Sequence, residues 1–149
     1  MQRRTRPWVG LLIILIFLTI SVGINFLPSQ WQAVKRVNDF NAAINANRPV
    51  DIYPYLIPEL RVMLTKEEFI KNFAKERSYP YLSPLYVYLD EVKLASDRRS
   101  GEAISTVAAR LPGQKMNVKL IYLKGQYYID AFRDIADGSY LLKFQNIKE

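Results

Sequence analysis

The side chains that could do chemistry in this chain are carboxylates and phenols, because its 149 residues include no histidine and no cysteine. Those two absences remove the commonest general base, the commonest metal ligand and every thiolate nucleophile. Asp90 and Asp130 fall on predicted strands, where a pocket walled by tyrosine could raise the pKa of an aspartate and make it a base. The alternative for Asp130 is a structural pair with Arg110 or Lys119 across a sheet. Asp90 lies beside Glu91, in a position that suggests solvent.

Ten tyrosines offer a second kind of chemistry, which is recognition by aromatic rings. Six of them are interleaved with prolines between residues 53 and 88. A tyrosine provides a large contact area at a low entropy cost, which suits a surface for sugars or peptides. The same rings would serve equally well in core packing, and both interpretations stay open. The predicted ligand- or partner-binding residues are Tyr53, Tyr55, Tyr86, Tyr88, Tyr122 and Tyr128.

The N-terminal segment predicts a membrane anchor. Three arginines precede an uncharged, apolar run over residues 8–27, which is long enough to cross a bilayer core of about 30 Å as a helix. The positive-inside rule keeps the arginines in the cytoplasm and places the following domain on the other side. A cleaved signal peptide is the alternative, although the run is longer than is usual for one. The residues expected to hold the chain at the membrane are Arg3, Arg4, Arg6, Trp8 and Leu27.

We therefore expect a single-pass protein of the cell membrane whose chain has two parts. Residues 1–28 form the cytoplasmic basic flank and the signal anchor, and residues 29–149 form one extracytoplasmic domain. The net charge is +7, but without the three N-terminal arginines there remain 18 basic and 14 acidic residues, a charge of +4. That excess suits a domain near an anionic lipid surface and is too weak for a nucleic-acid binder.

The first half of the domain carries helical signals. Residues 30–47 predict a helix whose apolar residues recur at three- and four-residue steps. Residues 51–64 include two prolines and predict short helical turns. Thr65 and Glu68 have capping-box spacing, which predicts a helix that ends at about Arg77. The apolar stripe of the first helix is expected at Trp31, Val34, Val37 or Phe40, and Ile44.

The second half changes to the alternating pattern of strands. Four strands are predicted over residues 85–94, 102–111, 115–123 and 126–133, with a short fifth strand or docking tail over 140–144. The turn after the first strand contains Arg98 and Arg99, and Lys124 with Gly125 forms a tight hairpin turn. Helices followed by a meander of strands predict the α+β class, with helices packed on one face of a curved antiparallel sheet.

This order of elements resembles the NTF2-like superfamily, which includes the SnoaL-like and ketosteroid-isomerase-like proteins. It is most similar to the membrane-anchored domains of that kind in bacterial envelopes, and a cystatin-like domain is the structural alternative. The resemblance implies a cone of helices on a curved sheet, association through the sheet, and in some relatives a ligand pocket. The matching residues are Ala43, Ile44, Asp51, Leu56, Pro58, Leu60, Glu68, Phe69, Leu120, Gly125, Tyr128 and Ile129.

The function expected from these signals is that of a membrane-anchored, non-enzymatic binding or assembly module of the cell envelope. It would act by sheet-mediated self-association, as a homodimer, or by contact with another envelope protein. One alternative is binding of a small apolar or sugar-like ligand in the cone. Another is a histidine-free isomerase or hydratase-like enzyme that uses a pocket aspartate. We predict no catalytic residue, no metal, no cofactor and no nucleic-acid partner.

Overall fold

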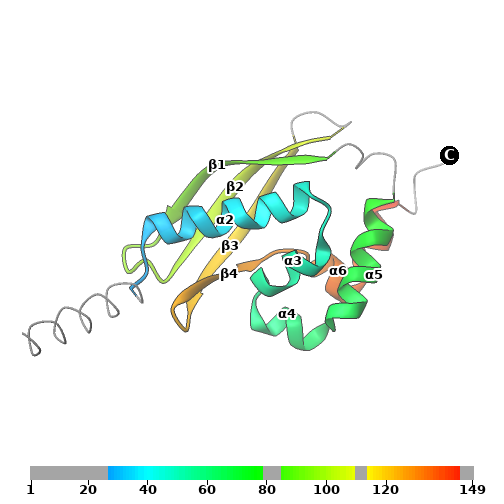
Figure 1. Cartoon of the computed structure of the whole chain (residues 1–149), viewed down its shortest axis with the longest axis horizontal. Helices are drawn as coiled ribbons and strands as arrows, with labels where there is room; N and C mark the ends of the chain where they lie inside the picture. Colours follow the sequence, from blue (N-terminus) through cyan, green and yellow to red (C-terminus); the bar gives the residue numbers. More distant parts are fainter. Residues whose placement is uncertain (1–26, 79–84, 110–113, 145–149) are drawn as a thin grey trace, which may run out of the picture.

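The computed structural model describes residues 27–78, 85–109 and 114–144, and in these ranges helices pack on a four-stranded antiparallel sheet (Figure 1). The chain is therefore of the predicted α+β class. The elements in chain order are α2 (Gln30–Asn45), α3 (Pro49–Ile52), the 3-10 helix η1 (Tyr53–Tyr55), α4 (Pro58–Met63), α5 (Lys66–Arg77), β1 (Tyr86–Leu94), β2 (Ser100–Ala108), β3 (Gln114–Leu123), β4 (Gln126–Asp130), α6 (Arg133–Asp137) and the 3-10 helix η3 (Ser139–Phe144).

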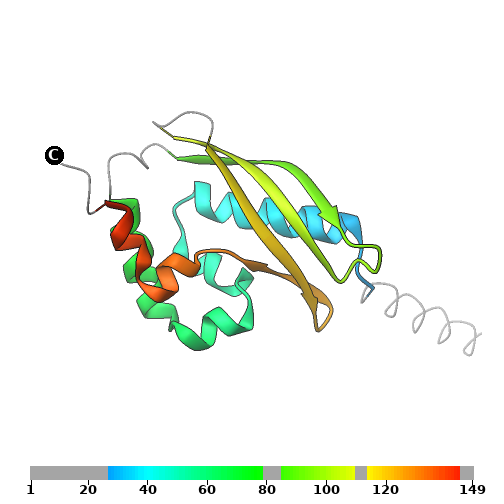
Figure 2. The same cartoon turned by 180° about the vertical axis from the view of Figure 1, so that it is seen from behind.

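The sheet is a meander in the order β1-β2-β3-β4. Its inner face lies against α2, and the view from behind shows β2 and β3 in front of that helix with no helix over them (Figure 2). Side chains alternate between the two faces along each strand. The alternation is interrupted once in β1, where the register shifts between Leu89 and Glu91 and leaves Asp90 as the extra residue.

The inner face is closed by a cluster of four aromatic rings from three separate segments. The Phe132 ring lies 5.9 Å from Phe40, 5.9 Å from Phe69 and 5.5 Å from Phe73 between centroids. Phe132 has a φ of 62°, a left-handed conformation that costs a residue with a side chain about 1–2 kcal/mol. Burial of the ring among the other three offsets that cost, and the turned backbone leads directly into α6.

Two predicted helix features can be compared directly with the structure. The capping box is confirmed, because the Thr65 hydroxyl accepts from the Glu68 amide and the Glu68 carboxylate accepts from the Thr65 amide. The apolar stripe of α2 is partly wrong, because Trp31 is 71% exposed. The helix instead turns Ala33, Val37, Phe40 and Ile44 toward the core.

Both edges of the sheet carry additional hydrogen bonds. At β1 the Asn45 side chain accepts from the Val87 amide at 2.7 Å and donates to the Val87 carbonyl at 3.0 Å. The Gln30 amide group, at the other end of α2, donates to the Val92 carbonyl at 2.7 Å. At β4 the Ile57 amide donates to the Ile129 carbonyl at 3.1 Å. The two ends of α2 and the segment before α4 therefore cover parts of opposite sheet edges.

Of the two alternatives predicted for residues 140–144, the fifth strand is wrong, and the docking tail agrees with Tyr140, which is buried in the core. Residues 139–144 form the 3-10 helix η3, and β4 ends at Asp130 rather than continuing to residue 133. A fifth strand of the meander would pair with β4, but Leu56 already makes a parallel bridge with Ile129 there. The left-handed backbone of Phe132 also turns the chain away from the sheet before a strand could continue.

The predicted anchor lies almost entirely outside the described residues, which begin at Leu27. Arg3, Arg4, Arg6 and Trp8 are among those not described, and Leu27 itself is 61% exposed. In the ranges 27–78, 85–109 and 114–144 there is no helix with the length and apolar character needed to span a membrane.

Candidate interaction surface

The six tyrosines singled out by the sequence lie in three different environments. Tyr53, Tyr55 and Tyr122 are partly buried and pack on the main core, and Tyr128 is 7% exposed in a second small cluster with Ile57. Only Tyr86 and Tyr88 are together at the surface, 51% and 56% exposed. Their rings stack with centroids 6.5 Å apart and an angle of 23° between the planes.

The buried members have polar partners that fix them structurally. The Tyr53 hydroxyl donates to the Leu64 carbonyl at 2.8 Å and joins η1 to the end of α4. The Arg36 guanidinium lies over the Tyr55 ring, 4.1 Å from the ring centroid. The Tyr128 ring has Arg61 at 5.3 Å from its centroid. These three rings act within the fold, so recognition by aromatic rings on the outer face rests on Tyr86 and Tyr88.

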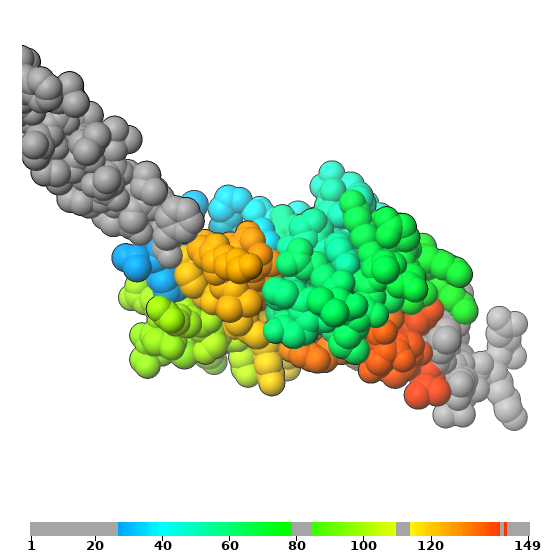
Figure 3. Space-filling model, turned by 90° about the horizontal axis from the view of Figure 1, so that it is seen from below, coloured from blue at the N-terminus to red at the C-terminus, as the bar shows by residue number. Residues whose placement is uncertain are grey.

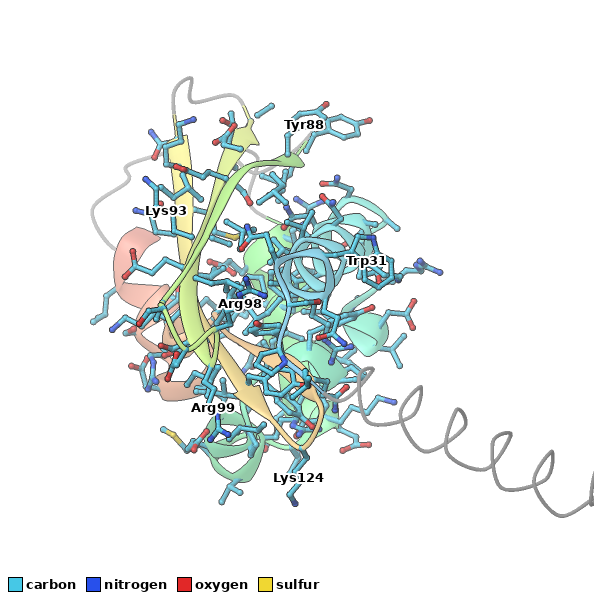
Figure 4. The ribbon with its side chains drawn as sticks, turned by 90° about the vertical axis from the view of Figure 1, so that its left-hand side faces the viewer. Trp31, Tyr88, Lys93, Arg98, Arg99 and Lys124 are labelled. Carbon is cyan, nitrogen blue, oxygen red and sulfur yellow. The ribbon has the colours of Figure 1, made fainter. Side chains whose placement is uncertain are left out.

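Tyr86 and Tyr88 belong to the outer face of the sheet, the face turned away from α2. Val87 between them is buried and pairs with Val107 on the inner side, so the two tyrosines point outward. Figure 4 shows Lys93 projecting from β1 on the side of the sheet away from α2, and Tyr88 at the upper edge of the sheet, clear of α2. We define the outer face by its outward-facing residues Tyr86, Tyr88, Asp90, Glu91, Lys93, Glu102, Ile104, Thr106, Lys115, Asn117, Lys119 and Ile121.

Charges on the outer face alternate across the strands. Lys93 pairs in register with Glu102, Glu102 with Lys119, and Lys119 with Asp130. An open hollow of about 560 Å³ lies around Gly101 and is lined in part by Lys93, Glu102 and Lys119. A side chain at Gly101 would place its Cβ 2.4 Å from the Lys93 carbonyl oxygen, so this position needs glycine. The row is mixed in sign and suits a protein surface better than a polyanion.

The two aspartates considered as bases are both held in ion pairs. The Asp90 carboxylate accepts from Lys115 at 2.9 Å and from the Thr106 hydroxyl at 2.9 Å. These hydrogen bonds hold the pKa of Asp90 below its usual value, and the bond from Lys115 has the larger effect. A carboxylate stabilised in this way is a weaker base. Asp130 accepts from Arg133 at 2.7 Å rather than from Lys119, and its Oδ1 has no hydrogen-bond partner among the described residues.

A partly open cavity of about 220 Å³ lies on the inner face between the end of α2, the end of α5 and the sheet. None of the six tyrosines lines it. Its volume is below the range of about 300–1,000 Å³ typical of small-molecule sites. Burial lowers the pKa of the Arg77 guanidinium at its rim. The lining residues are Ile44, Phe73, Glu76, Arg77, Leu85, Val87, Val107, Met116 and Phe132.

The ranges that the structure describes hold no group of three or more Asp or Glu side chains placed to bind a metal ion. No family model matches the chain, and no curated protein matches it significantly. The sequence did not indicate that Lys124 lies at the same end of the domain as Arg98 and Arg99. It predicted only that Lys124 and Gly125 form a tight turn at the tip of a hairpin.

Proposed function

We propose that this chain is a membrane-anchored, non-enzymatic binding or assembly module of the NTF2-like type. Its domain stands on the extracytoplasmic side of the cell membrane and contacts a second copy, or another envelope protein, through the outer face of the sheet. The observation that carries this proposal is the exposed Tyr86–Tyr88 stack on a face that α2 leaves uncovered. Stacked tyrosines at the surface contribute contact area at little entropy cost.

Two further observations support a face rather than an edge as the contact. The Val87 backbone is hydrogen-bonded by Asn45, and the Ile129 carbonyl is hydrogen-bonded by Ile57, so both sheet edges are partly occupied. When two faces meet with the two-fold axis between Lys93 and Glu102, Lys93 of each copy lies opposite Glu102 of the other. The order of elements, with a capped helix before a meander, supports the NTF2-like part of the proposal.

Disulfide trapping in membranes tests the contact, because the chain has no native cysteine. Ile104, at the middle of the outer face, is changed to Cys in the full chain, and Ala74 on the exposed side of α5 is changed to Cys as the matched control. With Ile104→Cys we expect mild oxidation to give a disulfide-linked dimer when the partner is a second copy. When the partner is another envelope protein, we expect chemical cross-linking through this cysteine to give an adduct with that protein. The Ala74→Cys control should give neither product.

The tyrosines are tested in the same background. Adding Tyr86→Ala and Tyr88→Ala to Ile104→Cys should reduce the trapped product at least severalfold, because the aromatic contact area is lost. Equal trapping with the tyrosines removed, or equal trapping from the control position, would contradict the proposal. Release of the full chain by an alkaline wash would separately contradict the membrane anchor.

A second candidate function is binding of a small apolar group in the inner cavity, which is supported by its apolar lining and by the Arg77 guanidinium at its rim. Native mass spectrometry of the chain released gently from its membrane would detect such a ligand as added mass. Filling the cavity with Val107→Phe should abolish the added mass and leave disulfide trapping through Ile104→Cys unchanged. Added mass that persists in this variant would place the ligand elsewhere.

A further inference from the structure

One end of the domain gathers three segments that are far apart in the sequence. The start of α2, the turn between β1 and β2 and the turn between β3 and β4 all lie at the end where the described chain begins (Figures 1 and 3). The opposite end is formed by α5, α6 and η3. The apolar run over residues 8–27 therefore joins the domain at the end with the two hairpin turns.

That end is basic and carries an exposed aromatic ring. Arg98, Arg99 and Lys124 are exposed on the two turns, and Trp31 is 71% exposed on the first turn of α2 (Figure 4). The acidic residue on these turns is Asp97, whose carboxylate accepts the Arg99 backbone amide at 2.9 Å. Two of the three cations therefore remain in excess over the acid at this end. We call these four residues, Trp31, Arg98, Arg99 and Lys124, the basic end.

The backbones that carry these cations are fixed. The Tyr127 hydroxyl on β4 donates to the Arg98 carbonyl at 2.6 Å and links the two hairpins. Burial is the largest cause that raises the pKa of Tyr127, so its phenol keeps the proton that this bond needs. The Tyr122 amide donates to the Arg99 carbonyl at 2.8 Å. A charged surface on a fixed backbone loses less conformational entropy on binding than one on a mobile loop.

We infer that the basic end docks on the anionic phosphate headgroups of the bilayer that holds the N-terminal segment. The inference rests on the membrane anchor of the proposed function. The described chain begins at the end of the domain that carries Arg98, Arg99 and Lys124 (Figure 4). These residues therefore lie next to the extracytoplasmic leaflet, where anionic phosphate headgroups attract basic side chains. Trp31 lies at the depth that tryptophan prefers, the boundary between headgroups and water.

Docking would also fix the orientation of the outer face. Helix α2 begins at the basic end and runs toward the far end of the sheet (Figure 1). With the basic end on the lipid, the strands stand upright on the membrane and the outer face points along it. Copies anchored in one bilayer would then meet through Tyr86 and Tyr88 without tilting.

The test measures the distance from the turn to the lipid in the full chain reconstituted in nanodiscs. A fluorophore attached at Ser96→Cys measures how close the basic end is to the lipid, and one attached at Ala74→Cys measures the same for α5 at the far end. Lipid labelled at its headgroup quenches a fluorophore that lies near it. We expect stronger quenching at residue 96 when phosphatidylglycerol is added to phosphatidylcholine, and its loss in high salt. Quenching at residue 74 should stay low with both lipids.

Charge removal identifies the residues responsible. Arg98→Gln, Arg99→Gln and Lys124→Gln together should lower the ratio of docked to undocked domain by at least about tenfold, since each cation is worth about fivefold at an anionic surface. The matched control, Lys66→Gln, Lys71→Gln and Lys75→Gln on α5, removes the same charge far from the turns and should leave quenching unchanged. Trp31→Ala should weaken docking less than the triple variant.

Two results would overturn the inference: equal quenching in neutral and anionic nanodiscs, or equal quenching in wild type and the triple variant. Retention after an alkaline wash reports the anchor alone, and all variants should pass it. If wild type is washed out, the anchor fails. The docking is then decided by whether that chain still binds phosphatidylglycerol vesicles and the triple variant does not.

Discussion

The two faces of the sheet share the same strands and differ in how far their residues are exposed. On the inner face, Phe40, Phe69 and Phe73 are at most 1% exposed and close around Phe132. On the outer face, Tyr86 and Tyr88 are more than half exposed and lie among alternating charges. A strand sends neighbouring residues to opposite faces, so folding and recognition can be assigned to alternate positions of one segment.

This contrast indicates where function can change without loss of the fold. The inner positions are packed against helices, and any loss of volume there costs cavity energy. The outer positions face solvent, and substitutions there cost little. Residues that bind a partner are therefore best sought among outward-facing aromatic residues, where packing does not explain them. The following predictions test this contrast in order of expected size.

The largest effect is expected from the aromatic cluster. Phe73→Ala should lower the free energy of unfolding by about 3–5 kcal/mol, because a fully buried ring is removed from among Phe69 and Phe132. Tyr88→Ala, its outer-face counterpart, should lower it by less than about 0.5 kcal/mol. Denaturant unfolding of the full chain in detergent, followed by circular dichroism, measures both. Similar losses for the two variants would break the contrast between the faces.

A smaller effect is expected where α2 holds the edge of β1. Asn45→Ala removes both hydrogen bonds to the Val87 backbone and should cost about 1–3 kcal/mol. Hydrogen exchange at the Val87 amide should also become faster. Asn38→Ala, at an exposed position of the same helix, is the matched control and should be nearly neutral. Unchanged exchange at Val87 in Asn45→Ala would show that the edge is protected in another way.

The smallest effect is expected from the Asp90 ion pair on the outer face. Hydrogen bonds from Lys115 and Thr106 lower the pKa of Asp90 below the ordinary value of 3.8, so its stabilising contribution is present above that pH. The contribution is lost as the pH falls through the lowered value. The unfolding midpoints of wild type and Asp90→Asn should therefore differ slightly near neutral pH and converge in acid. Lys115→Gln should reduce that difference, and a difference that grows in acid would contradict the assignment.

Local signals predicted the fold well where the responsible interaction is itself local. The Thr65 and Glu68 capping box, the end of α5 at Arg77 and the turn at Lys124 and Gly125 each depend on residues at most a few positions apart. The predicted fifth strand failed for a distant reason, because Leu56 occupies the edge of β4. No periodicity in residues 140–144 could have revealed that.

The candidate site was predicted in part for the same reason. Alternation around Val87 places Tyr86 and Tyr88 on one face, but it does not say which face α2 covers. Tyr53 is buried against α5, and Tyr128 lies on the outer side of β4 but is covered by Ile57 and Leu60, which no spacing along the chain reveals. Likewise, Lys124 and Arg98 come to the same end because hydrogen bonds from Tyr127 and Tyr122 link the two hairpins.

The occupied sheet edges have a consequence for the proposed anchoring of the domain in a membrane. Confinement to two dimensions raises the local concentration of copies, and an unpaired strand edge would then add strands of neighbouring chains without limit. The amide side chains of Asn45 and Gln30 occupy backbone groups of β1, and the Ile57 backbone occupies a carbonyl of β4. The bulge at Asp90 makes β1 still less regular as a template. Crowding of this protein should therefore produce closed pairs rather than growing fibres.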